Sequence, residues 1–203
     1  MIRSSRIVAI ALSSLALAAC QQKAVVVPAT ADEMSMGDPK AKVTVTEYAS
    51  AGCPFCARFA NEQFPAFKKK YIDSGKVRYI FREFPLDNLA SAASMLARCA
   101  GGDKTLPLIE TFYAKQADWA FVQGNPVPKL FDIAKQAGFT QESFDKCLTD
   151  QKLLDQITAA RTRASDTFGV SATPTFFING KRLTEAPTIE SFDKVIGPLL
   201  AAK

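Results

Sequence analysis

Histidine is absent from the sequence of 203 residues. This absence excludes serine–histidine–aspartate and cysteine–histidine catalysis, histidine-ligated metal sites and pH switching by an imidazole. A strong excess of one charge is also lacking. The net charge is +5, and it falls to about +3 if Arg3 and Arg6 leave with an export signal. Because no stripe of lysine and arginine interleaved with aromatic residues is present, the sequence predicts no nucleic-acid partner.

A long apolar run near the N-terminus predicts an export signal. It covers 7–19, follows a basic start and is too short to span a membrane comfortably. It ends in Leu17-Ala18-Ala19-Cys20, which resembles the bacterial lipobox, in which the cysteine is acylated after removal of the preceding residues, here 1–19. Ordinary cleavage after Ala18, leaving Cys20 as a free thiol, is the alternative. We favour acylation and therefore expect a protein of the cell envelope that faces the periplasm and is anchored to a membrane through lipid.

The number of cysteines supports acylation. Five is an odd number for an exported protein, because an oxidising compartment permits complete pairing. Modification of Cys20 leaves four cysteines, which allow three pairings. We favour Cys53 with Cys56 and Cys99 with Cys147. Two separate buried thiols are the alternative for the second pair.

The next segments predict a tether and then a strand–helix–strand unit. Residues 21–40 read as a tether, although their valine run could form a short edge strand. Residues 43–49 are rich in β-branched side chains and predict a strand, and 77–84 predict a second strand. Between them, apolar residues at spacings of three and four predict a helix from Phe55 onward, which Pro65 kinks or splits.

The rest of the chain predicts a block of helices followed by a return to extended structure. The helices are expected over 86–100, 106–119, 127–137, 141–148 and 153–168. Residues 173–178 predict a strand, Asn179-Gly180 is a strong hairpin signal, and 189–200 predict a final helix that frays at Gly197-Pro198. This order indicates a small α/β domain into which an all-helical segment is inserted.

Cys53-Pro54-Phe55-Cys56 is the motif that carries chemistry. It follows a strand and opens a helix, where unpaired N–H groups and the helix dipole stabilise a thiolate. We expect Cys53 to be the exposed cysteine that attacks, and Cys56 to face inward and resolve the mixed disulfide. A zinc site would need a second close cysteine pair, and haem attachment would need a histidine in place of Ala57. We therefore predict no metal and no cofactor beyond the disulfide of Cys53 and Cys56.

Two positions outside the motif are further candidates. Strand alternation places Glu47 on one face with Val43 and Val45. A carboxyl on an apolar face is costly unless it has a partner or a task, and this one could accept the proton of Cys56. A solvated acid at the strand end is the alternative. Thr173-Pro174 precedes the later strand, and local sequence alone leaves its cis and trans forms open.

The combined order and spacing of these features resemble the DsbA family of thioredoxin-fold proteins. The resemblance covers about residues 35–203 and rests on the cysteine motif after a strand, the acid six positions before it, the helical insertion, Thr173-Pro174-Thr175-Phe176, and Gly37-Asp38-Pro39 before the first strand. It implies an α/β thioredoxin fold formed by 41–87 and 169–203, interrupted by a helical insertion over 88–168.

The resemblance also implies roles for individual residues. Pro174 would be cis, with Thr173 beside the active disulfide, where the backbone of the two residues pairs with bound peptide. Glu47 would be the buried acid beneath the site, and Cys99 and Cys147 would form a second disulfide in the insertion. The implied activity is oxidation of cysteine pairs in exported proteins, with reoxidation by a DsbB-like quinone reductase or an equivalent membrane partner.

One departure from the family concerns Phe55. The best-known members have histidine at this position, where the imidazole helps to stabilise the thiolate, and phenylalanine offers no donor. We therefore expect a weaker oxidant. The motif alone leaves open a reductase or isomerase of the same fold, although we see no dimerisation segment and expect a monomer. A non-catalytic envelope lipoprotein that binds peptide or metal is the alternative from a different class.

Overall fold

The computed structural model describes residues 33–202. The export signal, Cys20 and the valine run lie outside the described residues. Within 33–202, no helix combines the length and the apolar character needed to cross a membrane.

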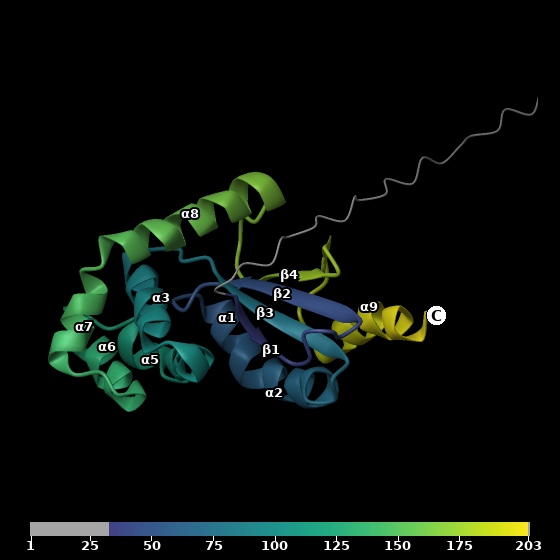
Figure 1. Cartoon of the computed structure of the whole chain (residues 1–203), viewed down its shortest axis with the longest axis horizontal. Helices are drawn as coiled ribbons and strands as arrows, with labels where there is room; N and C mark the ends of the chain where they lie inside the picture. Colours follow the sequence, from purple (N-terminus) through teal and green to yellow (C-terminus); the bar gives the residue numbers. More distant parts are fainter. Residues whose placement is uncertain (1–32, 203) are drawn as a thin grey trace, which may run out of the picture.

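A five-stranded sheet forms the centre of the molecule (Figure 1). Its order is β1-β3-β2-β4-β5, with bounds β1 Met34–Met36, β2 Val43–Ala49, β3 Val77–Glu83, β4 Thr175–Ile178 and β5 Lys181–Arg182. β2 and β3 are parallel, whereas the other neighbours are antiparallel. The predicted hairpin is confirmed, because β4 and β5 pair directly around Asn179-Gly180.

β1 was not predicted from the sequence. It lies within the segment assigned to a tether, and that assignment is wrong for Met34–Met36, which pair with β3 in the register Met34 to Phe81. Only one of its three side chains, that of Met34, is buried. A strand this short has no alternation long enough to recognise.

The helix that follows the cysteine motif is interrupted, as predicted from Pro65. α1 Pro54–Arg58 and α2 Phe64–Phe67 are separated by a π-helical segment, Phe59–Gln63, and a second π-helical segment, Lys68–Ile72, completes the element. Proline lacks the N–H that an α-helix requires, and it occupies the first turn of α2. The wider turn before it lets the chain continue without a sharp break.

Between β3 and β4, all the regular secondary structure is helical. These are α3 Asn88–Ala100, α4 Thr105–Ala114, α5 Gln116–Trp119, α6 Val127–Ala134, α7 Gln141–Leu148 and α8 Gln151–Phe168, with 3₁₀ turns at Gly102–Lys104 and Lys135–Ala137. The expected α/β fold with a helical block is therefore confirmed. Figure 1 shows most of this block beside the sheet, whereas α8 extends over the sheet.

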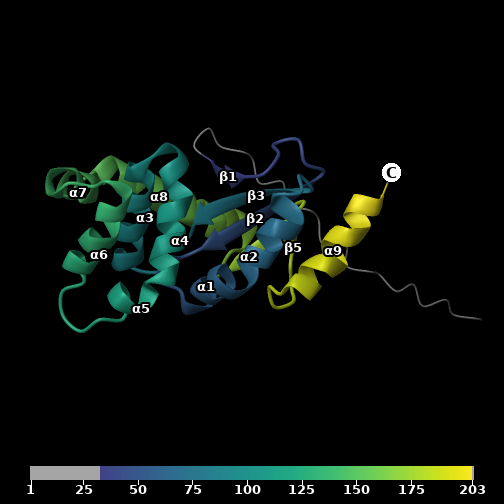
Figure 2. The ribbon, with the colours of Figure 1, turned by 90° about the horizontal axis from the view of Figure 1, so that it is seen from below.

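The two faces of the sheet are covered differently. The helix of 54–72 and α9 Ile189–Ala201 lie along one face of the sheet (Figure 2). They share a core with that face, in which Phe59 and Phe67 pack against Phe192. The end of α8 covers the opposite face, where Ala164 packs with Phe177. Both faces are buried, as a sheet with parallel central strands requires.

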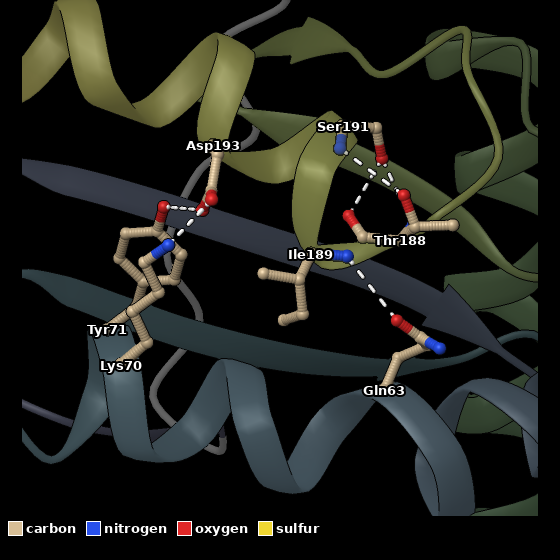
Figure 3. Close-up of polar contacts among 7 residues, drawn as sticks. All are labelled: Gln63, Lys70, Tyr71, Thr188, Ile189, Ser191 and Asp193. Carbon is tan, nitrogen blue, oxygen red and sulfur yellow. Dashed lines mark hydrogen bonds and ion pairs between the residues drawn. The ribbon is translucent and has the colours of Figure 1, made fainter.

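Polar contacts tie α9 to the helix of 54–72 (Figure 3). Thr188 and Ser191 form a capping box at the start of α9, and Gln63 accepts a hydrogen bond from the Ile189 amide at 3.4 Å. Lys70 and Tyr71 both donate to Asp193, the lysine at 2.6 Å. These contacts fix α9 against the helix that begins with the cysteine motif.

The expected fraying at Gly197-Pro198 is wrong. α9 continues to Ala201, and the Ala202 amide still donates to the Pro198 carbonyl at 3.0 Å. The Lys42 ammonium donates to the carbonyls of Leu200 and Ala202, so the last carbonyls of the helix have a cationic partner.

Candidate active site

Cys53 lies at the end of the turn that connects β2 to α1. The turn after β2 is closed by a hydrogen bond from the Cys53 amide to the Ser50 carbonyl at 3.0 Å. Cys53 is the N-cap of α1, with extended backbone, and Pro54 occupies the first helical position. This arrangement directs the unpaired amides of the first helical turn toward the Cys53 sulfur.

Both cysteines of the motif are free thiols and both are buried. Cys56 is 0% exposed and Cys53 only 4%, so the expectation that Cys53 is exposed is wrong for this structure. The cause is the loop before β4, because the Cys53 thiol donates to the Thr173 carbonyl at 3.3 Å. The Thr173-Pro174 peptide bond in that loop is cis.

The two thiols have opposite acid–base properties. Donation from the Cys56 thiol is the largest influence on the pKa of Cys53. Together with contributions from Thr173 and from the amides of Cys56 and Phe55 it outweighs burial, and it lowers the pKa of Cys53 to about 5. Burial, followed by the hydrogen bond with Cys53 and the charge of Glu47, raises the pKa of Cys56 far above that of a free thiol. Near neutral pH, Cys53 is therefore the thiolate and Cys56 the thiol.

Glu47 is buried on β2 and interacts electrostatically with both cysteines. It is 3% exposed, and the Tyr79 hydroxyl donates to its carboxyl. Burial raises the pKa of Glu47 to about 8, against the opposing effect of the Tyr79 hydrogen bond. The carboxyl is not a solvated acid at a strand end, and near neutral pH it is mostly protonated.

Three residues that contribute to the site were missed at the sequence level. Tyr79 on β3 bonds Glu47, and Tyr113 on α4 lies in the same buried core as Cys56. Gln116 on α5 donates to the carbonyls of Ala51 and Cys53 at 2.7 and 3.1 Å. The helical block therefore holds the backbone of the cysteine turn. Strand alternation with Val77 could have predicted that Tyr79 faces the core. No local sequence pattern predicts that Tyr113 and Gln116 lie near the cysteine motif.

Phe55 projects outward from the motif. Its side chain is 64% exposed, and the Arg58 guanidinium lies 5.6 Å from its ring centroid. Leu86 and Phe121 are also large, apolar and exposed. Leu86 precedes Asp87, whose carboxylate lies beside Gly52 of the cysteine turn, and Phe121 follows Gln116 by five residues. Phe55 thus places an exposed apolar ring within the cysteine motif itself.

Cys99 and Cys147 are joined by a disulfide with a Cα–Cα distance of 6.1 Å. It links α3 to α7, within the helical block. Among residues 33–202, no cluster of three or more histidine, cysteine, aspartate or glutamate side chains is arranged to hold a metal ion.

Comparisons with known proteins agree with this geometry. The family model described as Thioredoxin matches residues 29–197. The crystal structure of Wolbachia pipientis alpha-DsbA1 is 31% identical, covers 85% of this chain and 92% of its own, and superposes with a TM-score of 0.79. Curated relatives named "Putative protein-disulfide oxidoreductase" are 35% identical in Rickettsia bellii and 33% in Rickettsia typhi, each over 81% of this chain.

The fold and the paired cysteines define a thioredoxin-fold protein with a helical insertion. The chain belongs to the thioredoxin family, and within it to the DsbA-like proteins. It spans 63% of the length of the Rickettsia bellii relative and 61% of that of Rickettsia typhi.

Proposed function

We propose that this chain is a thiol–disulfide oxidoreductase that passes the Cys53–Cys56 disulfide to cysteine pairs in exported proteins. The observation that carries the proposal is the contrast between the two cysteines. Cys53 caps a helix and contacts the Thr173 carbonyl at 3.3 Å, whereas Cys56 is fully buried beside a protonated carboxyl. The family membership and the names of the relatives support the same activity.

The proposed reaction has two exchange steps. A substrate thiolate attacks the Cys53 sulfur and forms a mixed disulfide, and the bond to Cys56 breaks with the electron pair leaving on Cys56. Cys56 takes the proton of Glu47, whose pKa near 8 keeps it protonated near neutral pH. A second substrate thiolate then attacks the substrate sulfur and releases Cys53 as a thiolate. The substrate gains a disulfide and the enzyme pair is reduced by two electrons.

The surroundings of Cys53 suit a polypeptide substrate. Thr173 and Pro174 bring backbone to the sulfur, and an extended peptide could pair with that backbone. Pro54 shapes the turn, and the exposed ring of Phe55 offers a contact for apolar side chains of an unfolded chain. Folded proteins hide such side chains, so this surface favours substrates that have not finished folding.

The direction of transfer follows from thiolate stability. A low pKa of Cys53 stabilises the reduced enzyme and makes the disulfide a better oxidant. We propose an oxidase on this ground, reoxidised by a membrane quinone-linked partner of DsbB type. The proposal includes a monomer, anchored through acylated Cys20 to an envelope membrane, in which 41–87 and 169–203 form the thioredoxin domain and 88–168 the insertion.

Two measurements test the proposal. Cys53→Ser should abolish oxidation of a model peptide dithiol, and an unchanged rate would indicate a non-catalytic binding module. Trapping thiols in cells with an alkylating reagent gives the redox state of the Cys53 and Cys56 pair. A mostly oxidised pair is expected for an oxidase, and a mostly reduced pair would indicate a reductase or isomerase.

A further inference from the structure

Within residues 33–202, four buried side-chain polar atoms lack a hydrogen-bond partner. Three of them belong to residues around the cysteine motif: Ser50, Tyr113 and Thr173. Ser50 begins the cysteine turn, and Thr173 contacts Cys53. A buried donor without a partner is costly, so unpaired donors gathered at one place point to an acceptor that is absent from the resting thiol state.

Of these three groups, the Tyr113 hydroxyl belongs to the core that also contains the deeper cysteine, Cys56. Tyr113 is 4% exposed and packs in the same core as Cys56. Its hydroxyl has no hydrogen-bond partner, and Cys56 is the charged group with the largest influence on it. Burial first, and then the charges of Cys56 and Glu47, hold the pKa of Tyr113 well above its usual range, so its proton is retained.

Neighbouring contacts fix the backbone around Tyr113. The Asn61 amide donates to the Tyr113 carbonyl at 3.3 Å, which links α4 to the helix of the cysteine motif. Three residues further along the chain, Gln116 bonds the Cys53 carbonyl. These contacts hold the segment that contains Tyr113 against the cysteine motif.

We propose that Tyr113 donates a hydrogen bond to the Cys56 sulfur as it leaves the disulfide, and so accelerates the first exchange step. This inference rests on the proposed function. A thiol or disulfide sulfur is a weak acceptor, whereas a thiolate is a strong one. The hydrogen bond therefore forms as negative charge develops on Cys56, which is the condition for lowering a barrier.

Tyr113 and Glu47 have separate tasks in this step. The substrate thiolate forms a bond to the Cys53 sulfur, the Cys53–Cys56 bond breaks, and Cys56 departs with the electron pair. Tyr113 stabilises the departing sulfur and keeps its own proton, and Glu47 then delivers the proton that makes Cys56 a neutral thiol. The second exchange step releases Cys53 and does not involve Tyr113.

Tyr113→Phe tests the inference, because it removes the hydroxyl and keeps the ring. The oxidised full chain is mixed with excess dithiothreitol, and loss of the Cys53–Cys56 disulfide is followed by rapid quenching and alkylation. The variant should react about tenfold more slowly than the unmodified protein, the size expected for one charge-assisted hydrogen bond. Tyr71→Phe is the matched control and should react at the unmodified rate, since its hydroxyl bonds Asp193 instead.

A second measurement separates catalysis from structure. In a Cys56→Ser background, Cys53 is loaded with glutathione and its release by dithiothreitol is timed; Tyr113→Phe should leave this rate unchanged. The inference is overturned if Tyr113→Phe does not slow opening of the disulfide, or if it slows both reactions equally. Tyr113→Leu serves if the phenylalanine variant does not fold. Failure of the proposed function has a different signature: the unmodified protein would then react no faster than a simple dialkyl disulfide.

Discussion

The Tyr79 hydroxyl donates to the Glu47 carboxyl across the β2–β3 pair. Burial raises the pKa of Glu47 and this hydrogen bond lowers it, and the net result is a pKa of about 8. The pKa of this carboxyl therefore lies close to neutral pH, where the group can both donate and accept a proton.

Removal of the Tyr79 hydroxyl should raise the pKa of Glu47. In Tyr79→Phe the carboxyl keeps its burial and loses its donor, so its titration should move above pH 8. Infrared titration of the protonated carboxyl band, with Glu47→Gln to identify the band, measures the shift. A midpoint unchanged from that of the unmodified protein would show that the hydrogen bond has no influence on the carboxyl.

Glu47 should also make stability depend on pH. Because burial raises its pKa from 4.5 to about 8, the folded protein holds a proton that the unfolded chain releases between these values. Its contribution to stability is complete below about pH 4.5 and is lost as the pH rises through about 8, by on the order of 1 kcal/mol per pH unit. The free energy of unfolding of the unmodified protein should therefore fall relative to that of Glu47→Gln across this window. Urea unfolding at several pH values checks this, and parallel curves would contradict it.

The sequence predicted the parts of the site that depend on local pattern. The alternation of 43–49 placed Glu47 on the face of Val43 and Val45, and the resemblance to the DsbA family implied that it is buried, as it is. The strand before Cys53 placed that cysteine at the start of a helix, as found. The burial of Cys53 could not be predicted, because Thr173 covers it from 120 positions away in the chain. The contributions of Tyr113 and Gln116 to the site could not be predicted for the same reason, because only the packing of the helical block brings these residues to the motif.

Phe55 should limit the oxidising power of the active disulfide. Its side chain is 64% exposed and cannot donate to the Cys53 thiolate. Phe55→His should make the potential more oxidising by a few tens of millivolts, because one donor to the thiolate is added. Equilibration with glutathione measures the potential, and Phe55→Leu should match the unmodified protein. A histidine variant with an unchanged potential would contradict this explanation.

The second disulfide should serve stability and leave the exchange chemistry unaffected. It joins α3 to α7 across 48 positions of the chain, within the helical block. Replacing Cys99 and Cys147 together by alanine should lower the free energy of unfolding by about 2–4 kcal/mol. Urea unfolding measures this loss. Oxidation of a model peptide dithiol should proceed at the unmodified rate, and a large change in that rate would show that the disulfide influences the active site.

The most direct test of the whole account is a pH titration of the Cys53 thiolate in the reduced protein, followed by thiolate absorbance at 240 nm. A midpoint near pH 5 is expected, lost in Cys53→Ser and retained in Cys99→Ala/Cys147→Ala. Such a midpoint means that neighbouring donors hold this sulfur as an anion at neutral pH. A midpoint near 9, the ordinary value for cysteine, would contradict the account.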